Sequence, residues 1–335
     1  MSRQTDPLAV LREYPADCQP LWLEPLGSAG GFSGAMFWRL GARSGRLCLR
    51  RWPPGYPTRE KLEFIQAVLW HATREGFRRV PLPLETRNHR GYVAHGGFLW
   101  ELAPWLPGTA DYAQHPTPAR LRAAMVTLAE FHRATATFPL PDLPASRSPG
   151  IRSRLVRLGR WIEGDLDRLA EAIQPGLFAE IEGRAWQVLS LTRQAAPSVL
   201  ALLEQLCDTR VQLQPCICDV WHEHVLFEAD RVTGLIDFGS MRPESVAADV
   251  ARLLGSMAGD DRSKWEMGLE AYQSLRRLSP GELALVTGFD RSTTVLAGLN
   301  WLEWIYCQRR VFENRQAIPG RLDVIIQRLA RLVSS

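Results

Sequence analysis

Two aspartates stand at the ends of neighbouring apolar runs, where their carboxylates could act together. Asp219 follows the run at residues 216–218, and Asp237 lies within the run at residues 234–238. The residues between the two runs have the pattern of a short hairpin. Carboxylates on neighbouring strands can hold a divalent cation, act as a base, or do one of each. Because a buried carboxylate is costly without a partner, the apolar surroundings of Asp237 predict a divalent cation beside it.

The same stretch allows an alternative, a zinc-binding module. Cys216, Cys218, His222 and His224 are four ligands of the kind that tetrahedral zinc accepts. Zinc patterns usually separate their ligands into two distant pairs, so a chelate this tight would be strained. Small residues such as cysteine are also common in apolar strands. The zinc module is therefore a minor alternative.

A glycine- and serine-rich segment near the N-terminus could bind phosphate. Residues 26–40 read as a strand, a turn with little side-chain bulk, and a second strand. Backbone N–H groups in such a turn can approach phosphates closely, although an ordinary glycine hairpin has the same pattern. The chain contains only two lysines, Lys61 and Lys264. A phosphate-anchoring cation in this part of the chain is therefore expected to be an arginine, a planar bidentate donor.

The elements that must position these groups can be read from periodicity and capping. Residues 46–52 alternate as a strand does, and Thr58 could cap a helix that begins at Arg59. An amphipathic helix is predicted over residues 117–136, and residues 263–335 read as helical throughout.

Composition limits the classes of protein to which the chain can belong. The 335 residues carry a net charge of +4 and six scattered cysteines. The N-terminus lacks the apolar core of a signal peptide, and no apolar run reaches the roughly 18 residues of a membrane span. Scattered thiols are typical of a reducing compartment, and the chain has no strongly basic run. We expect a cytoplasmic protein without a membrane or nucleic-acid partner.

Residues 216–239 resemble the catalytic segment of aminoglycoside phosphotransferases and choline-kinase-like small-molecule kinases, a branch of the protein-kinase-like fold. That family carries His-Gly-Asp-x4-Asn, a short hairpin, and Ile-Asp-Phe/Trp-Gly/Glu. Asp219 matches the catalytic-loop aspartate, and the Ile-Asp-Phe-Gly at residues 236–239 matches the metal-binding motif. The chain departs from the pattern in two places: Ile-Cys replaces His-Gly before Asp219, and His224 occupies the position of the metal-binding asparagine.

The resemblance implies an α+β, two-lobed protein-kinase-like fold. Residues 1–106 would form a small N-lobe with an antiparallel sheet that binds the nucleotide. Residues 107–335 would form a larger, mainly helical C-lobe with the catalytic loop, the metal site and the substrate-binding helices. His132 and Asp249 match positions that support the active-site loops in the family.

The resemblance also implies a role for each candidate site residue. Asp219 would be the base or acceptor-positioning residue, and Asp237 and His224 would be the metal ligands. Glu63 would pair with the strand cation, with Glu60 as a competing choice. The nucleotide-binding residues would be Gly30, Gly31, Ser33 and Gly34 in the phosphate loop, Arg50 as the strand cation, Glu63, and the backbone of Glu101, Leu102 and Ala103 at the adenine edge.

These roles imply an ATP- or GTP-dependent phosphotransferase that moves the terminal phosphate to a hydroxyl of a small metabolite. The expected cation is Mg²⁺, or Mn²⁺ because an imidazole nitrogen at His224 suits a softer ion better. A nucleotide-binding pseudokinase is the alternative that His224 raises. The chain shows no acidic cluster of the kind expected to line an aminoglycoside site, so we do not predict an antibiotic as acceptor.

Overall fold

The computed structural model describes residues 6–28, 34–140, 145–174, 176, 178–310, 312 and 315–334. The chain divides into two compact units, and each is described by itself below. The first unit comprises residues 1–138 and 222–241, and the second comprises residues 139–221 and 242–335. These units are defined by packing alone. The lobe boundary expected between residues 106 and 107 concerns nucleotide and substrate binding, and it stays a prediction.

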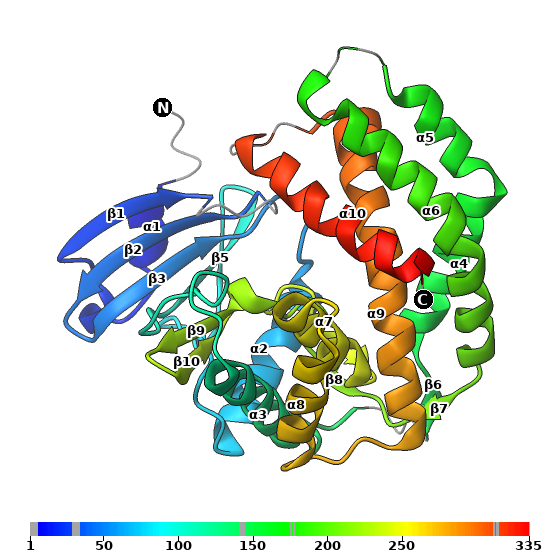
Figure 1. Ribbon diagram of the computed structural model, residues 1–335. Coiled ribbons are helices and arrows are strands. Elements are labelled where there is room, and N and C mark those ends of the chain that lie inside the picture. Colours follow the sequence, from blue (N-terminus) through cyan, green and yellow to red (C-terminus); the bar gives the residue numbers. More distant parts are fainter. Residues whose placement is uncertain are drawn as a thin grey trace. The chain divides into compact units, whose positions relative to one another are not determined.

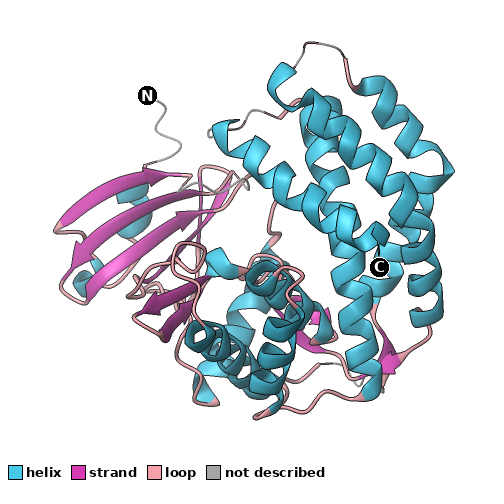
Figure 2. Ribbon diagram, in the orientation of Figure 1, coloured by secondary structure: helices cyan, strands magenta, loops and turns pink. Residues whose placement is uncertain are grey.

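The first unit contains a five-stranded antiparallel sheet with the order β1-β2-β3-β5-β4, and a separate two-stranded hairpin (Figures 1 and 2). Its elements are α1 (Pro7–Leu11), η2 (Ala16–Cys18), β1 (Trp22–Gly27), β2 (Met36–Ala42), β3 (Gly45–Arg51), α2 (Arg59–Arg74), β4 (Val93–His95), β5 (Phe98–Pro104), α3 (Pro118–Thr135), η4 (His222–His224), β9 (Val225–Glu228) and β10 (Arg231–Leu235).

Alternation along β3 decides which side chains face the core and which face the candidate site. Leu47 and Leu49 are buried and pack in a cluster with Leu11 and Tyr14 from the N-terminal segment. Burying each leucine contributes about 1.5–3 kcal/mol. Because successive side chains of a strand point to opposite faces, Arg50 lies on the other face of the sheet. Strand β3 (Gly45–Arg51) confirms the strand predicted at residues 46–52, shifted by one residue.

Helix α2 begins where its cap predicts. Thr58 Oγ1 accepts a hydrogen bond from the Lys61 amide at 3.3 Å. The apolar stripe of the helix includes Leu62 and Ile65, both buried. Leu62 belongs to a cluster with Trp52, the residue that follows β3. Packing of this stripe therefore holds α2 close to the end of the strand that carries Arg50.

The hairpin predicted between the two apolar runs is present as β9 and β10. The strands pair antiparallel from Val225↔Leu235 to Glu228↔Arg231, with a register irregularity between Val232 and Gly234. The backbone of Phe227 also exchanges two hydrogen bonds with Thr109, at 2.9 and 3.0 Å. These bonds join the hairpin to the segment that follows β5 within the first unit.

The second unit is mainly helical (Figure 2). Its elements are β6 (Ser146–Arg147), α4 (Pro149–Arg160), η3 (Trp161–Asp165), α5 (Leu166–Ala172), α6 (Ala179–Leu206), β7 (Arg210–Val211), β8 (Gln214–Cys216), β11 (Arg242–Glu244), α7 (Ala247–Ala258), α8 (Arg262–Gln273), α9 (Pro280–Leu302), η5 (Glu303–Cys307), η6 (Arg315–Ala317) and α10 (Ile318–Ser334).

Helix α6 is the centre of the second unit and packs against α4, α9 and α10 (Figure 1). The helical character predicted for residues 263–335 is confirmed over their described part. Strands β8 and β11 pair antiparallel, with Cys216 opposite Arg242 and Gln214 opposite Glu244. This small ladder fixes the start of the segment that leads to Asp219.

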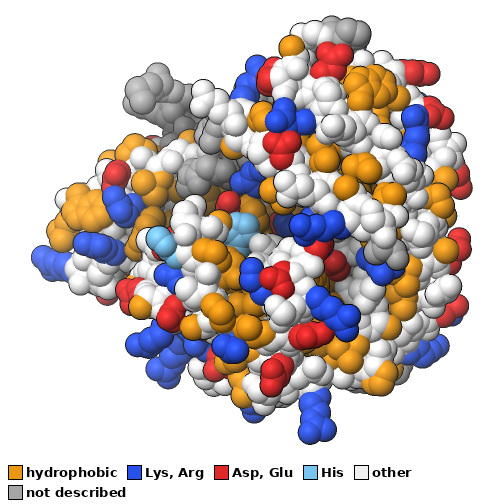
Figure 3. Space-filling model, viewed as in Figure 1, with side chains coloured by type: hydrophobic (Ala, Val, Ile, Leu, Met, Phe, Trp, Pro, Cys, Tyr) orange, Lys and Arg blue, Asp and Glu red, His pale blue; other side chains and the backbone are white. Residues whose placement is uncertain are grey.

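On the face shown in Figure 3, Lys and Arg side chains are interspersed with Asp and Glu. Among the helices in the described part of the chain, none is both long enough and apolar enough to cross a bilayer.

Gly108→Ala should destabilise the first unit more than Gly76→Ala. The two glycines have nearly the same left-handed φ, +93° and +94°, so alanine strains both backbones by about 1–2 kcal/mol. At Gly108 an added Cβ would also lie 2.8 Å from the Phe227 carbonyl oxygen and against Thr233, whereas nothing lies within 4 Å at Gly76. We expect an extra loss of about 1–3 kcal/mol for Gly108→Ala in urea unfolding. Equal losses would show that this close approach does not constrain the hairpin.

Candidate active site

Arg50 is held in a fixed orientation on the face of the sheet opposite Leu47 and Leu49. Its guanidinium lies 3.4 Å from the centroid of the Trp52 ring and 5.3 Å from that of Phe37. Its Nη2 donates a hydrogen bond to Asp237 Oδ1 at 3.1 Å. Stacking and ion pairing together leave only 13% of the Arg50 side chain exposed. A planar cation placed in this way can donate two parallel hydrogen bonds to a phosphate or a carboxylate.

Asp237 combines an unusual backbone conformation with a shielded negative charge. Its φ is +62°, in the left-handed region that aspartate tolerates better than most residues. Burial acts to raise the pKa of Asp237, but Arg50, His224 and the Gly239 amide outweigh it and hold the pKa below its ordinary value. The carboxylate is thus kept ionised while 41% of the side chain remains exposed.

His224 faces the second oxygen of the same carboxylate. Its Nε2 lies 3.7 Å from Asp237 Oδ2, and its carbonyl accepts the Ile236 amide at 3.0 Å. The hairpin brings the two residues together, and their binding of a metal ion stays a prediction. An oxygen and a nitrogen at this separation form a mixed donor pair, which suits Mn²⁺ better than Mg²⁺.

The segment after Asp237 is packed tightly against the end of β3. A Cβ added at Gly239 would lie 3.2 Å from the Trp52 ring, so this position favours glycine. The Tyr56 hydroxyl donates to the Gly239 carbonyl at 2.6 Å, and Lys61 Nζ donates to the Met241 carbonyl. These contacts keep the backbone around Asp237 close to Arg50.

A glutamine links helix α2 to the sheet beside Arg50. Gln66 is 1% exposed, and its Nε2 donates to Glu101 Oε2 at 2.7 Å. Glu101 is the cross-strand partner of Arg50 in the β3–β5 ladder, so the two side chains lie on the same face. Burial raises the pKa of Glu101, against the Gln66 hydrogen bond and the Arg50 charge. Sequence reasoning missed Gln66, although a polar residue on the apolar stripe of α2 was a usable signal.

The structure gives the two candidate helix glutamates other contacts. Glu63 is exposed and accepts a hydrogen bond from the Tyr92 hydroxyl at 2.8 Å. Glu60 lies in the first turn of α2, where its own amide and Thr58 lower the pKa of its carboxyl. The carboxylate that contacts Arg50 is that of Asp237, so the expected pairing with Glu63 or Glu60 has to be corrected.

The backbone predicted to face adenine lies inside the sheet. Cys48↔Ala103 and Arg50↔Glu101 are cross-strand pairs of β3 and β5, and the Leu102 carbonyl accepts the Leu84 amide at 2.8 Å. Trp105 also donates to the Arg46 carbonyl at 2.9 Å. Glu101 and Ala103 are therefore paired with β3 and the Leu102 carbonyl is occupied by Leu84, so an adenine edge is expected to begin after them.

The glycine-rich segment connects β1 and β2, as the sequence predicts. Gly30, Gly31 and Ser33 lie outside the described residues. Gly34 is described and has a φ of +77°. An added Cβ there would lie 3.6 Å from Pro53, which is ordinary van der Waals contact. Only the conformation of Gly34, and not its packing, therefore favours glycine.

Asp219 belongs to the second unit and is paired with an arginine of α7. Arg252 Nη2 lies 3.1 Å from Asp219 Oδ1, and Arg252 Nε lies 3.2 Å from the same oxygen. Nearly half of the Asp219 side chain is exposed, at 48%. The carboxylate is thus oriented by a charged hydrogen bond and is still accessible to a small molecule.

Asp249 holds the backbone that leads to Asp219. Its two carboxylate oxygens accept the Ile217 and Cys218 amides at 2.7 and 2.6 Å, and the side chain is fully buried. Cys218 has a φ of +66°, which turns the chain away from strand geometry. The supporting role expected for Asp249 is confirmed. His132, the other expected support, is likewise fully buried in the first unit.

The two cysteine thiols named in the zinc alternative lie in surroundings that favour their neutral form. Burial raises the pKa of Cys216 and of Cys218 well above the ordinary value, and Asp249 adds to both shifts. Cys216 Sγ also donates to the Glu244 carbonyl at 3.3 Å, so its role is structural.

The fold is the protein-kinase-like fold. The aminoglycoside phosphotransferase of Alicyclobacillus acidocaldarius is similar over 98% of both chains, with a TM-score of 0.61 and 19% identity. A spectinomycin phosphotransferase in complex with ADP and spectinomycin is similar over 94% of both chains, with a TM-score of 0.63 and 12% identity. At these identities the likeness concerns the fold.

Sequence similarity identifies the family. A profile of the phosphotransferase enzyme family matches residues 25–284, and the chain belongs to that family. A homoserine kinase of Methylobacterium nodulans is 27% identical over 230 residues, which cover 67% of this chain and 64% of the relative. The alignment thus spans slightly less than two thirds of that relative. The chain is therefore a member of the phosphotransferase enzyme family with the protein-kinase-like fold.

Asp249→Ala should destabilise the second unit strongly. The substitution leaves the Ile217 and Cys218 amides without their acceptor, and hydrogen bonds to a charged group contribute about 1.5–3 kcal/mol each. Asp249→Asn keeps one acceptor oxygen and should cost about half as much. Urea unfolding of both variants, with exposed Asp208→Ala as the control, measures the difference. If Asp249→Ala is no less stable than Asp208→Ala, these bonds do not hold the loop.

Arg50→Met should reverse the effect of Asp237 on acid stability. In the wild type a lowered pKa means that the carboxylate's contribution is present above about pH 4 and is lost as the pH falls further. Without Arg50, burial becomes the dominant influence and raises the pKa of Asp237. Stability should then fall as the pH rises from about 4.

A carboxyl ¹³C NMR titration, assigned with Asp237→Asn, measures the pKa of Asp237 directly. Unfolding midpoints at several pH values test the linkage to stability. Arg39→Met is the control, because Arg39 pairs with the exposed Glu24. An unchanged pKa of Asp237 in Arg50→Met would contradict the assignment.

Proposed function

We propose that this phosphotransferase moves the terminal phosphate of ATP or GTP to a hydroxyl of a small metabolite. The observation that carries the proposal is the contact between Arg50 and Asp237, 187 residues apart in the chain. It brings a guanidinium beside an ionised carboxylate on the face of the sheet opposite Leu47 and Leu49. Such a pair can position a nucleotide phosphate and its metal ion.

In this proposal Arg50 binds phosphate oxygens of the nucleotide, together with the loop that contains Gly30, Gly31, Ser33 and Gly34. Glu101, which is held by Gln66 of α2, lies beside Arg50 on the neighbouring strand. The ADP in the spectinomycin phosphotransferase of the same fold supports a nucleotide as the donor. Arginine is suited to this role because it donates two parallel hydrogen bonds and stays charged.

We infer that the adenine edge begins at the Pro104 carbonyl and the Leu106 amide. Backbone groups of successive strand residues point in opposite directions. Ala103 pairs with β3 and Trp105 donates to Arg46. The residues that alternate with them, Pro104 and Leu106, therefore point away from β3. This moves the inferred edge beyond residues 101–103.

Asp237 and His224 would hold the divalent cation. The fit rests on the exposed Asp237 carboxylate and on the 3.7 Å between its Oδ2 and His224 Nε2. A bound cation would neutralise charge on the transferred phosphate. The imidazole nitrogen favours Mn²⁺ over Mg²⁺, so we propose that either ion serves and that Mn²⁺ serves better.

Asp219 would orient the acceptor hydroxyl and take its proton. The acceptor oxygen then forms a bond to the terminal phosphorus, the bond to the bridging oxygen breaks, and ADP or GDP leaves with the electron pair. The homoserine kinase relative supports a small hydroxy compound as the acceptor. We propose a cytoplasmic enzyme without a nucleic-acid or membrane partner.

A nucleotide-binding pseudokinase is the second candidate. His224 favours it, because an imidazole stands where the family's amide oxygen ligand is expected. A pseudokinase of this kind would bind the nucleotide without the divalent cation and would not transfer phosphate.

Asp219→Asn and Asp237→Asn should separate transfer from nucleotide binding. Loss of a general base lowers turnover by about 10²–10⁴-fold, so Asp219→Asn should lose transfer and keep nucleotide affinity. Asp237→Asn should lose the stabilisation by ATP that depends on Mg²⁺ or Mn²⁺. Thermal shifts with ATP and GTP, each with Mg²⁺, Mn²⁺ or no metal, measure binding through mass action.

Asp208→Asn is the control, since Asp208 is 73% exposed and pairs with Arg147. Stabilisation by ATP that needs no metal in the wild type would favour the pseudokinase. If Asp219→Asn and Asp237→Asn both behaved like Asp208→Asn, the assignment of the site would be wrong.

A further inference from the structure

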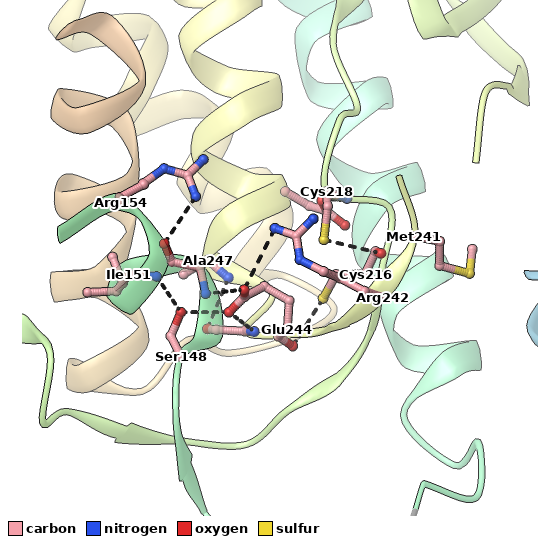
Figure 4. Close-up of polar contacts among 12 residues, drawn as sticks. Ser148, Ile151, Arg154, Cys216, Cys218, Met241, Arg242, Glu244 and Ala247 are labelled. Carbon is pink, nitrogen blue, oxygen red and sulfur yellow. Dashed lines mark hydrogen bonds and ion pairs between the residues drawn. The ribbon is translucent and has the colours of Figure 1, made fainter. Parts of the chain in front are cut away.

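Three arginines of the second unit lie near the segment that carries Asp219. Arg242 is the cross-strand partner of Cys216 in the β8–β11 ladder. Arg252 contacts Asp219 from α7. Arg154 lies on α4 and is close enough to both other arginines to be repelled by them. Figure 4 shows Arg154 and Arg242 on either side of Glu244.

Arg154 is positioned by the start of its helix. Ser148 Oγ donates to Glu244 Oε1 at 2.6 Å, and the Gly150 amide donates to Glu244 Oε2 at 2.7 Å (Figure 4). The Ile151 amide donates to Ser148 Oγ at 3.1 Å, which caps α4. Because Glu244 is fully buried in β11, this set of bonds fixes α4 against the small ladder.

The guanidinium of Arg154 has hydrogen-bonding capacity to spare. Its Nε is buried and has no hydrogen-bond partner, and its Nη1 makes one long bond of 3.4 Å to the Gly150 carbonyl. Burial lowers the pKa of Arg154 to about 10; Glu244 opposes this shift, while Arg242 and Arg252 add to it. A buried cation in these surroundings is stabilised by an anion that accepts from it.

The neighbouring carboxylates are already occupied by other donors. Glu244 accepts from Ser148, from the Gly150 amide and from the Ser245 amide at 2.9 Å, whereas Arg242 is 3.9 Å away. Asp249 accepts two backbone amides. Glu244 and Asp249 are therefore occupied mainly by backbone donors. Arg154 Nε is left without a partner, whereas Arg252 would share its donors between Asp219 and a ligand.

We propose that Arg154, Arg242 and Arg252 form a subsite for an anionic group, a carboxylate or a phosphate, carried by the acceptor. That the anionic group belongs to the phosphate acceptor rests on the proposed function, in which Asp219 receives the acceptor hydroxyl. Arg252 connects the anion-binding subsite to the residue that would position the hydroxyl, because it contacts Asp219 itself. The acceptor would be a hydroxy acid, a hydroxy amino acid or a phosphorylated alcohol. A polycationic amino sugar would be repelled by the same three charges.

Calorimetric titration of the full-length protein with matched pairs of small molecules tests the subsite without requiring turnover. The pairs are 4-hydroxybutyrate with 1,4-butanediol, and glycerol 3-phosphate with glycerol, each measured with and without AMP-PNP. We expect the anion of at least one pair to bind about tenfold or more tightly than its neutral match. Preference for the first anion identifies a carboxylate site, and preference for the second identifies a phosphate site.

Arg242→Gln and Arg154→Gln should each weaken binding of that anion about tenfold and leave the affinity for AMP-PNP unchanged. Arg242 is 42% exposed, so its variant is expected to fold even if Arg154→Gln does not. Arg152→Gln, an exposed position on the same helix, is the control. Arg154→Lys, which keeps the charge and loses the planar fork, should lie between Arg154→Gln and the wild type.

The subsite is refuted if neither anion binds more tightly than its neutral match, or if Arg242→Gln and Arg154→Gln bind the anion as Arg152→Gln does. A drop in AMP-PNP affinity with unchanged anion binding would assign the arginines to the nucleotide and would equally overturn the proposal. Transfer of phosphate is a separate readout. Anion binding without phosphate transfer would support the subsite and refute the proposed function. Equal phosphate transfer to 4-hydroxybutyrate and to 1,4-butanediol would support the proposed function and refute the subsite.

Discussion

The ion pair between Arg50 and Asp237 is the interaction on which the first unit depends. It joins a strand near the N-terminus to a segment 187 residues later, at 3.1 Å. Stacking on Trp52 keeps the cation from turning toward solvent. The pair lies next to the hairpin of residues 225–235, and together with the backbone bonds between Thr109 and Phe227 it joins this late segment to the first unit. A neutral residue at either position would leave its partner's charge half-buried without compensation.

In this lysine-poor chain, arginine and not lysine provides the cations that pair with the candidate functional carboxylates. Arg50 contacts Asp237 in the first unit, and Arg252 contacts Asp219 in the second. Each candidate functional carboxylate is thus paired with a guanidinium inside its own unit. A bound phosphate or metal ion must therefore exchange partners with an existing ion pair, so its binding energy is the difference between two sets of charged contacts. This exchange favours a ligand that binds the carboxylate and at the same time gives the arginine a new hydrogen-bond acceptor.

Local patterns of the sequence predict those parts of the fold that short-range physics decides. Alternation predicts β3, Thr58 predicts the start of α2, and the Ile-Asp-Phe-Gly motif predicts the neighbourhood of Asp237. The partner of Arg50 could not be predicted in this way. Glu63 and Glu60 both had suitable spacing on α2, but the side chain that reaches the sheet is Gln66, and the carboxylate at Arg50 comes from Asp237. Spacing along one helix does not specify which turn faces a given strand.

The sequence by itself determined the family of this protein, because residues 25–284 match the phosphotransferase enzyme family and the Asp219 and Asp237 motifs resemble the same family. Only the tertiary structure decided which backbone groups of β5 are used up in the sheet, and that Asp249 anchors the Ile217 and Cys218 amides. The physical reason is that motifs record residue types at short separations. Hydrogen-bond partners and ion pairs between distant segments are chosen by packing, which no local pattern encodes.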